Sequence, residues 1–176
     1  MVSGEAPSLP FHVEEVPATA PVSALRHAQE LLLEYGHFLA GQLSAAQFCF
    51  GSLQKEAARL PFFYLEQGGG CLMAYAKGEP AGFIAWRTLP LTIAPAAWEL
   101  KRLWVRPAAR GLGLGRALLK AALDRAVAAG QQSVFLDTAP DAMATAVRLY
   151  FELGFKPCAP YRDHPVEGLA YFVKHL

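Results

Sequence analysis

Residues 99–116 read ELKRLWVRPAARGLGLGR, which places a β-strand, three glycines at alternate positions and a helix start in direct succession. The helix should run from Leu114 to Ala129, because this segment is rich in Ala, Leu and Arg and is followed by Gly130. Glycines allow close approach of the backbone to a ligand and positive φ. A helix start offers free N–H groups and the positive end of its dipole. The stretch therefore predicts an anion site between a strand and a helix.

The distribution of charge supports this site. The 176-residue chain is 53% hydrophobic and 18% charged, which is typical of a folded domain. Its net charge of +1 gives no case for nucleic acid or a membrane surface as a partner. Between Glu99 and Lys120, however, one acid, Glu99, accompanies six cations, which are Lys101, Arg102, Arg106, Arg110, Arg116 and Lys120. A basic segment around glycines in a nearly neutral protein suggests a small polyanionic ligand.

Two common anion motifs do not fit the glycine segment. No Gly-Lys-Ser/Thr follows it, so it is not a Walker A loop. A dinucleotide fingerprint would follow the first strand of a parallel βαβ unit, whereas these glycines lie past the middle of the chain, after an apparent meander. The alternative is a glycine-rich helix entry that binds nothing.

Periodicity and turn signals predict the remaining elements. Strands are expected at Phe11–Val16, Cys71–Ala76, Ala81–Thr88, Trp98–Val105, Ser133–Leu136, Phe155–Cys158 and Leu169–Lys174. A helix should begin near Ser23, with Gly36 and Gly41 as breakers, and a second should run from Ser44 as N-cap to about Leu60. Thr138 to Asp141 has the form of a capping box and should open a helix that ends at Leu153. This order predicts a single α+β domain over residues 1–176, with 1–10 as a flexible arm.

Cysteine usage and hydropathy bear on the compartment. Three widely spaced cysteines, Cys49, Cys71 and Cys158, include no CxxC and no Cys/His cluster, so we expect no metal site. A chain with neither a leader pattern nor an apolar run of membrane-spanning length is expected to be cytoplasmic and reduced.

Three motifs together resemble the GNAT superfamily of N-acetyltransferases. Arg110, Gly113 and Gly115 match its acyl-CoA signature Arg/Gln-x-x-Gly-x-Gly/Ala, and residues 99–105 look like its central strand. Residues 146–155, AVRLYFELGF, look like its Ala-x-x-Leu-Tyr-x-x-x-Gly-Phe helix ending. The resemblance runs from about Cys71 to the C-terminus and is weak over the first 60 residues.

The resemblance implies a mixed, mostly antiparallel sheet that is splayed at its centre, with acetyl-CoA in the gap and no metal. The backbone of Leu103 and Val105 would pair with the pantetheine amides, and N–H groups from Leu112 to Arg116 would bind the pyrophosphate. The full set of implied cofactor-binding residues is Leu103, Trp104, Val105, Arg110, Gly111, Leu112, Gly113, Leu114, Gly115, Arg116, Thr138, Met143 and Ala146. Met143 departs from the family, which often carries Asn there.

Acetyl transfer to an amine needs an acid for the departing thiolate and a base for the amine. The resemblance makes Tyr150 the candidate acid; the alternative is a core tyrosine packed with Ala146, Leu149 and Leu153 at helical spacing. Glu99 is the candidate base, acting through water. Its alternative is a surface pair with Lys101 on a solvated strand edge.

The expected activity is transfer of acetyl from acetyl-CoA to a primary amine of a small molecule, by direct attack in a ternary complex. The alternatives are a non-catalytic acyl-CoA sensor and an enzyme that acetylates a protein or peptide. Candidate acceptor-site residues are Tyr35, Phe62, Tyr64, Tyr161, Arg162 and His164, and candidate contacts to the 3′-phosphate are Arg106 and Lys120. A homodimer is a common default for such a protein.

Overall fold

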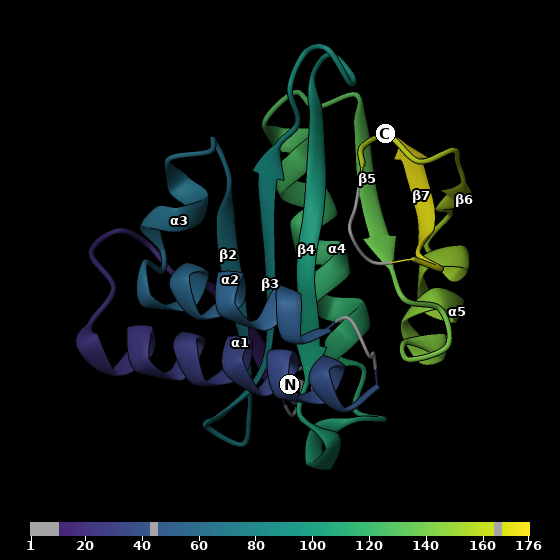
Figure 1. Ribbon diagram of the computed structural model, residues 1–176. Helices are drawn as coiled ribbons and strands as arrows, with labels where there is room; N and C mark the ends of the chain where they lie inside the picture. The colour runs from purple at the N-terminus through teal and green to yellow at the C-terminus, as the bar shows by residue number, and fades with distance from the viewer. Residues whose placement is uncertain (1–10, 43–45, 164–166) are drawn as a thin grey trace, which may run out of the picture.

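The computed structural model describes residues 11–42, 46–163 and 167–176 (Figure 1). In these residues one sheet has the strand order β1-β2-β3-β4-β5-β7-β6, and all neighbours are antiparallel except the parallel pair β4 and β5. The strands are β1 Phe11–Glu15, β2 Gly70–Ala76, β3 Glu79–Thr88, β4 Ala97–Val105, β5 Ser133–Thr138, β6 Lys156–Pro157 and β7 Ala170–His175. The predicted α+β fold with a mostly antiparallel sheet is confirmed.

Helices cover both faces of the sheet (Figure 1). They are α1 Val22–Gln42, α2 Ala46–Ala58, the short α3 Phe62–Leu65, α4 Leu114–Ala128 and α5 Ala144–Glu152. Helices α1, α2 and α3 lie on one face, where Leu31, Leu53 and Tyr64 are buried with Phe83 of β3. Helices α4 and α5 lie on the other, where Leu118 is buried among Ile84, Leu100 and Tyr150. Two apolar layers therefore hold the sheet between them.

The sheet opens between its two central strands. Strands β4 and β5 pair only through Ala97–Glu99 and Ser133–Phe135. Beyond that point β4 contains an irregularity in its register with β3, and Arg102 has a positive φ of 63°. The rest of β5 pairs with β7 and has no partner in β4. The gap between the two strands is the splay that the family resemblance implied.

Two local predictions are wrong. Helix α1 continues through Gly36, which is buried, and ends only at Gln42. Glycine costs about 1 kcal/mol in a helix interior, and burial of the apolar face of α1 outweighs that cost. Gly41 lies inside the same helix and does not break it. Ser44, the predicted N-cap of α2, lies outside the described residues, as does the predicted arm at residues 1–10.

The capping box at Thr138 does not form. Thr138 is the last residue of β5 and pairs with Ala170 of β7, and α5 begins six residues later with Met143 as its N-cap and no side-chain cap. Pairing within the sheet outweighs the local capping pattern at this position.

The described residues include no group of three or more His, Cys, Asp and Glu side chains arranged to hold a metal ion. Among the helices of the described part of the chain, none combines the length and the apolar character that crossing a bilayer requires.

Candidate active site

The glycine segment forms a tight turn into α4. Gly111 and Gly113 have φ values of 82° and 87°, in the left-handed region that side chains disfavour, and Gly113 is the N-cap of α4. The Gly113 carbonyl accepts the hydrogen bond of the Ala117 N–H at 3.0 Å, which closes the first helical turn. The first N–H groups of α4 have no partner within the helix, so they can bind an anion.

A cleft of about 520 Å³ lies beside this turn. One wall is the glycine segment and the start of α4, the other is the segment 141–149 with α5, and the end of β4 contributes residues 103–105. Eleven of the predicted cofactor-binding residues line it: Leu103, Trp104, Val105, Arg110, Gly111, Gly113, Leu114, Gly115, Arg116, Met143 and Ala146. The side chain of Leu112 is exposed and Thr138 lies deeper, so neither lines this cleft.

Three arginines give the cleft its positive charge. Arg110 lies over the rings of Trp104 and Phe38, 5.1 and 5.8 Å from their centroids, and its Nε donates to the Val105 carbonyl at 3.2 Å. Arg116 of α4 pairs with Glu152 of α5, and Arg148 of α5 is exposed at the same cleft. Sequence reasoning did not single out Arg148 or Phe38. Arg148 is a cation within the Ala-x-x-Leu-Tyr motif, which is a signal that was available.

The remaining cations predicted for the cofactor are used elsewhere. Arg106 donates from Nε and Nη2 to Glu34 of α1 and from Nη1 to the Pro80 carbonyl at 2.7 Å. Lys120 pairs with Asp124 one turn along α4. Neither lines the cleft.

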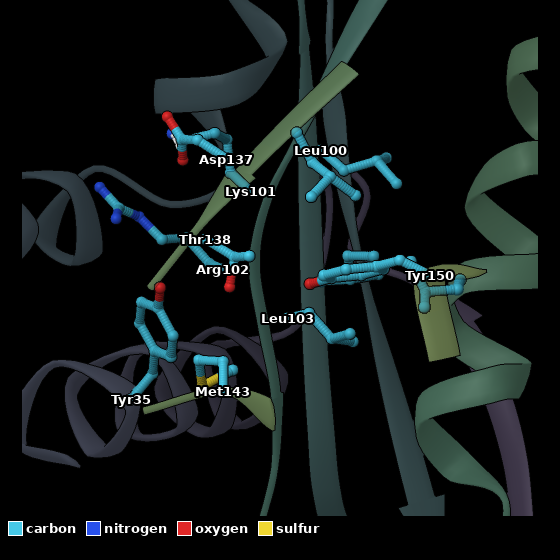
Figure 2. A pocket seen from close by; sticks show the side chains of 12 residues that line it. Tyr35, Leu100, Lys101, Arg102, Leu103, Asp137, Thr138, Met143 and Tyr150 are labelled. Carbon is cyan, nitrogen blue, oxygen red and sulfur yellow. Dashed lines mark hydrogen bonds and ion pairs between the residues drawn. The ribbon is translucent and has the colours of Figure 1, made fainter. Parts of the chain in front are cut away.

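A second, much smaller cavity of about 20 Å³ lies in the splay of the sheet (Figure 2). Its walls come from β3, β4, β5, α1, α4 and α5 with the residue before α5, and it is lined by Tyr35, Ile84, Leu100, Lys101, Arg102, Leu103, Leu119, Leu136, Asp137, Thr138, Met143 and Tyr150. Leu103 and Met143 also line the large cleft, so the two spaces meet at these residues.

Tyr150 faces the small cavity from the α5 side. Its ring is 5% exposed and packs against Phe155 and Phe172, with centroids 5.8 and 6.0 Å away. In Figure 2 its hydroxyl points toward Leu103, and Tyr35 enters from the opposite side. Burial raises the pKa of the Tyr150 phenol, so the phenol carries its proton at neutral pH. The ring packing agrees with the core tyrosine of the alternative, and the role of the hydroxyl as an acid stays a prediction.

Glu99 is fully buried on the opposite face of β4 from Leu100 and lines neither cavity. Its carboxylate accepts hydrogen bonds from Arg87 Nε at 2.7 Å and from the Tyr161 hydroxyl at 2.9 Å. Arg162 Nε and Lys101 Nζ lie 2.9 and 3.5 Å from it. Burial alone would raise the pKa of the Glu99 carboxyl, but the three cations together hold it below its ordinary value. The Glu99–Lys101 pair exists, although not on the solvated edge that the alternative expected.

Asp137 of β5 belongs to the same charged cluster, which consists of Arg87, Glu99, Lys101, Asp137 and Arg162. Its Oδ1 lies 3.3 Å from Lys101 Nζ, and its Oδ2 accepts a hydrogen bond from Arg162 Nη2. Sequence reasoning missed Asp137. A lone acid in the apolar strand 133–138 was the available signal, because alternation in a strand separates it from the buried Leu136.

A second buried ion pair fixes the α1 and α2 side of the small cavity. Arg102 donates from Nε and Nη2 to Glu56 of α2, at 3.2 and 3.0 Å, and its guanidinium lies 5.9 Å from the centroid of the Tyr35 ring. Tyr64 donates its hydroxyl to Glu56 and is 1% exposed. Tyr64 therefore braces the wall behind the cavity.

The predicted acceptor residues separate into three groups. Tyr35 lines the small cavity, and Tyr161 and Arg162 bind the acids beside it. Tyr64 and Phe62 do not line either space, since one is buried behind the cavity and the other is 50% exposed on the surface. His164 lies outside the described residues.

Comparisons with known proteins agree with this geometry. The model of the acetyltransferase (GNAT) family matches residues 39–155. An uncharacterized N-acetyltransferase of Schizosaccharomyces pombe is 43% identical over 77 residues, which are 44% of this chain and 47% of that protein. An IAA acetyltransferase of Azospirillum brasilense is 37% identical over 76 residues, 43% of this chain and 49% of that protein. The chain thus spans about half the length of these relatives.

Solved structures share the fold. The PaiA N-acetyltransferase of Thermoplasma acidophilum, crystallised in complex with coenzyme A, has a TM-score of 0.65 at 18% identity, over 94% of this chain and 99% of that one. The family model covers most of the chain, and the splayed sheet, the glycine turn and the Ala-x-x-Leu-Tyr helix are all in place. The chain belongs to the GNAT acetyltransferase family.

Proposed function

We propose that the chain is an N-acetyltransferase that moves acetyl from acetyl-CoA to a primary amine of a small molecule by direct attack in a ternary complex. One observation carries the proposal: the large cleft and the small cavity meet at Leu103 and Met143, and Tyr150 lines the small cavity together with these two residues. A long cosubstrate in the cleft would place its reactive end where a second molecule can reach it from the other face of the sheet.

The cleft suits acetyl-CoA in charge and in shape. The α4 N-terminus, with its two left-handed glycines, would hold the pyrophosphate, and Arg110 and Arg116 add charge-assisted donors. The edge of β4 that faces the splay has no ladder partner after Glu99, so its backbone can pair with the pantetheine amides through Leu103 and Val105. Of the predicted set, Leu112 would contribute its backbone N–H, and Thr138 would lie near the acetyl end.

Tyr150 is the proposed acid. Its buried phenol would donate a proton to the departing sulfur, and burial, which raises the pKa of Tyr150, would also raise the pKa of a thiol formed beside it. Glu99, the candidate base, would act indirectly and would not touch the amine itself. Its carboxylate is enclosed by Arg87, Lys101, Arg162 and Tyr161. A backbone N–H near Val105, where the chain leaves the sheet, would stabilise the oxyanion.

The space beside Tyr150 measures about 20 Å³ and is walled by Tyr35, Arg102 and Asp137, so only a narrow group such as the primary amine end of an acceptor would fit there. We also propose a cytoplasmic location, which the free thiols of Cys71 and Cys158 support, since such thiols persist in reducing compartments. We also propose that the protein forms a homodimer, which size-exclusion chromatography can test.

The cofactor site can be tested by isothermal titration of acetyl-CoA and CoA into the wild type and a Gly113→Glu variant. The variant places bulk and negative charge where the pyrophosphate would approach. Gly78→Glu is the matched control, because Gly78 has a φ of 81°, also left-handed, and lies in the open β2–β3 turn. We expect wild type and the control to bind and Gly113→Glu to lose at least about 1.4 kcal/mol, a tenfold change in Kd. Equal binding by all three would refute the site.

The class of acceptor requires a second experiment. Release of free thiol from acetyl-CoA is measured with a panel of primary amines and a panel of peptides. Transfer to small amines supports the proposal, and transfer only to peptides favours protein acetylation. Binding of acetyl-CoA without transfer to any amine or peptide favours the non-catalytic sensor.

A further inference from the structure

The charged cluster beside the small cavity contains two carboxylates, and they differ in access. The side chain of Asp137 is 11% exposed and lines the small cavity together with Tyr150, whereas that of Glu99 is 0% exposed and lines neither space. A molecule that enters the cavity from the α1 face therefore meets Asp137 before any other acid of the charged cluster. Figure 2 shows Asp137 and Lys101 together at one end of the cavity, with Tyr150 across from them.

A closed ring of alternating charges holds Asp137 in place. Lys101 Nζ bridges Asp137 Oδ1 at 3.3 Å and Glu99 Oε1 at 3.5 Å. Arg162 bridges the same two acids, with Nη2 on Asp137 and Nε 2.9 Å from Glu99. The ring ties β4 to β5 and to the segment after β6, so the Asp137 carboxylate is held from two sides. A carboxylate has about four lone-pair sites, so in general it can accept an N–H in addition to binding a cation on each oxygen.

The surrounding charge favours an uncharged amine. With Arg87 on the outer side of Glu99, the cluster contains three cations and two acids, which is one positive charge in excess. Arg102 is also nearby, but Glu56 pairs with it. A like charge close by disfavours a second cation, so a bound ammonium loses its proton more readily here than in water. Attack on a thioester requires that uncharged form.

We propose that Asp137 is the catalytic residue that binds the acceptor's amine and takes its first proton, and that Glu99 positions it through Lys101 and Arg162. The proposal rests on the proposed function. An acceptor that arrives as an ammonium gives one proton to Asp137, which releases it to solvent. The nitrogen lone pair then forms the C–N bond while the C–S bond breaks. Tyr150 donates its proton to the sulfur and recovers one from the nitrogen, which yields an amide, a thiol and one released proton.

The test compares Asp137→Asn with Glu99→Gln, using two kinds of acceptor. One is the best alkylamine of the panel, which is an ammonium at neutral pH, and the other is hydroxylamine, which is already uncharged there. For Asp137→Asn we expect kcat/KM to fall at least about 10²-fold with the alkylamine and less than about tenfold with hydroxylamine. The Kd for CoA should stay within about threefold of wild type, which is under 1 kcal/mol. Glu99→Gln should also lower kcat/KM more for the alkylamine than for hydroxylamine, but by a smaller factor than Asp137→Asn, because it displaces the Asp137 carboxylate without removing it.

Equal losses with the two acceptors for Asp137→Asn, or a CoA affinity that falls in parallel, would assign Asp137 a structural role and overturn the proposal. So would retention of activity with the alkylamine. If Asp137→Asn does not fold, Asp137→Glu keeps the charge and tests the same point. Its displaced carboxylate should still lower kcat/KM more for the alkylamine than for hydroxylamine. Failure of the proposed function is a separate result: the wild type itself would transfer acetyl to neither acceptor.

Discussion

Replacement of Glu99 by Gln removes a fully buried charge from the centre of the ion-pair cluster. The carboxylate contacts Arg87, Lys101 and Arg162, whose side chains are 29%, 9% and 23% exposed, so all three lose a partner in surroundings that are largely closed to water. Breaking a buried ion pair by removal of one partner costs about 3–5 kcal/mol. Glutamine keeps an oxygen that can accept from Arg87 or Tyr161, which favours the lower end, about 3 kcal/mol.

The free energy of unfolding in urea measures this loss, as a lower midpoint at an unchanged slope. A domain stabilised by about 5–15 kcal/mol should still fold with this change. The matched control is Asp124→Asn, which breaks the exposed Lys120–Asp124 pair on α4 and should cost less than about 1 kcal/mol. A loss for Glu99→Gln as small as that of the control would show that the cluster contributes no net stability, and the reasoning on Glu99 would be wrong.

Two further predictions concern the pH dependence of stability and the binding of CoA in the cleft. Because the folded-state pKa of Glu99 lies below its ordinary value of 4.5, its stabilisation is present above that pH and is lost as pH falls through the folded pKa. The difference in unfolding free energy between wild type and Glu99→Gln should therefore shrink on acidification, and a constant difference in urea titrations at several pH values would contradict this. Arg110→Ala should weaken CoA about tenfold, because it removes a charged donor at the cleft, whereas Lys120→Ala should leave the Kd unchanged in the same titration.

The sequence predicts most of the fold because its signals are local. Alternating strands, the Lys77–Gly78 turn and the glycine segment all act within a few residues, and the structure places their elements within a few residues of the expected bounds. The errors arise where tertiary contacts outweigh a local pattern. Gly36 continues α1 because the helix is packed against the sheet, and Thr138 stays in β5 because β7 pairs with it.

The candidate site also has one part that local sequence signals predict and one part that they do not. The proposed cofactor cleft is built around one contiguous segment, residues 103–116, together with the Ala-x-x-Leu-Tyr helix, so its motif is readable in the sequence. The proposed acceptor side is built from residues that are distant along the chain. Glu56 meets Arg102 from 46 positions away, and Arg162 meets Asp137 from 25 positions away. No periodicity or spacing rule brings such residues together, so the pairing of Glu56 with Arg102 and that of Asp137 with Arg162 become visible only in the fold.

Acetyl transfer by wild type and Tyr150→Phe, followed as thiol release across pH with the best amine of the panel, tests the central claim most directly. The two proteins differ by one hydroxyl at the small cavity, on a residue that does not line the large cleft, so CoA affinity should match between them. We predict that kcat falls about 10²-fold or more in Tyr150→Phe, because the departing sulfur loses its proton donor. A kcat within about threefold of wild type at every pH would contradict the assignment of Tyr150 as the acid.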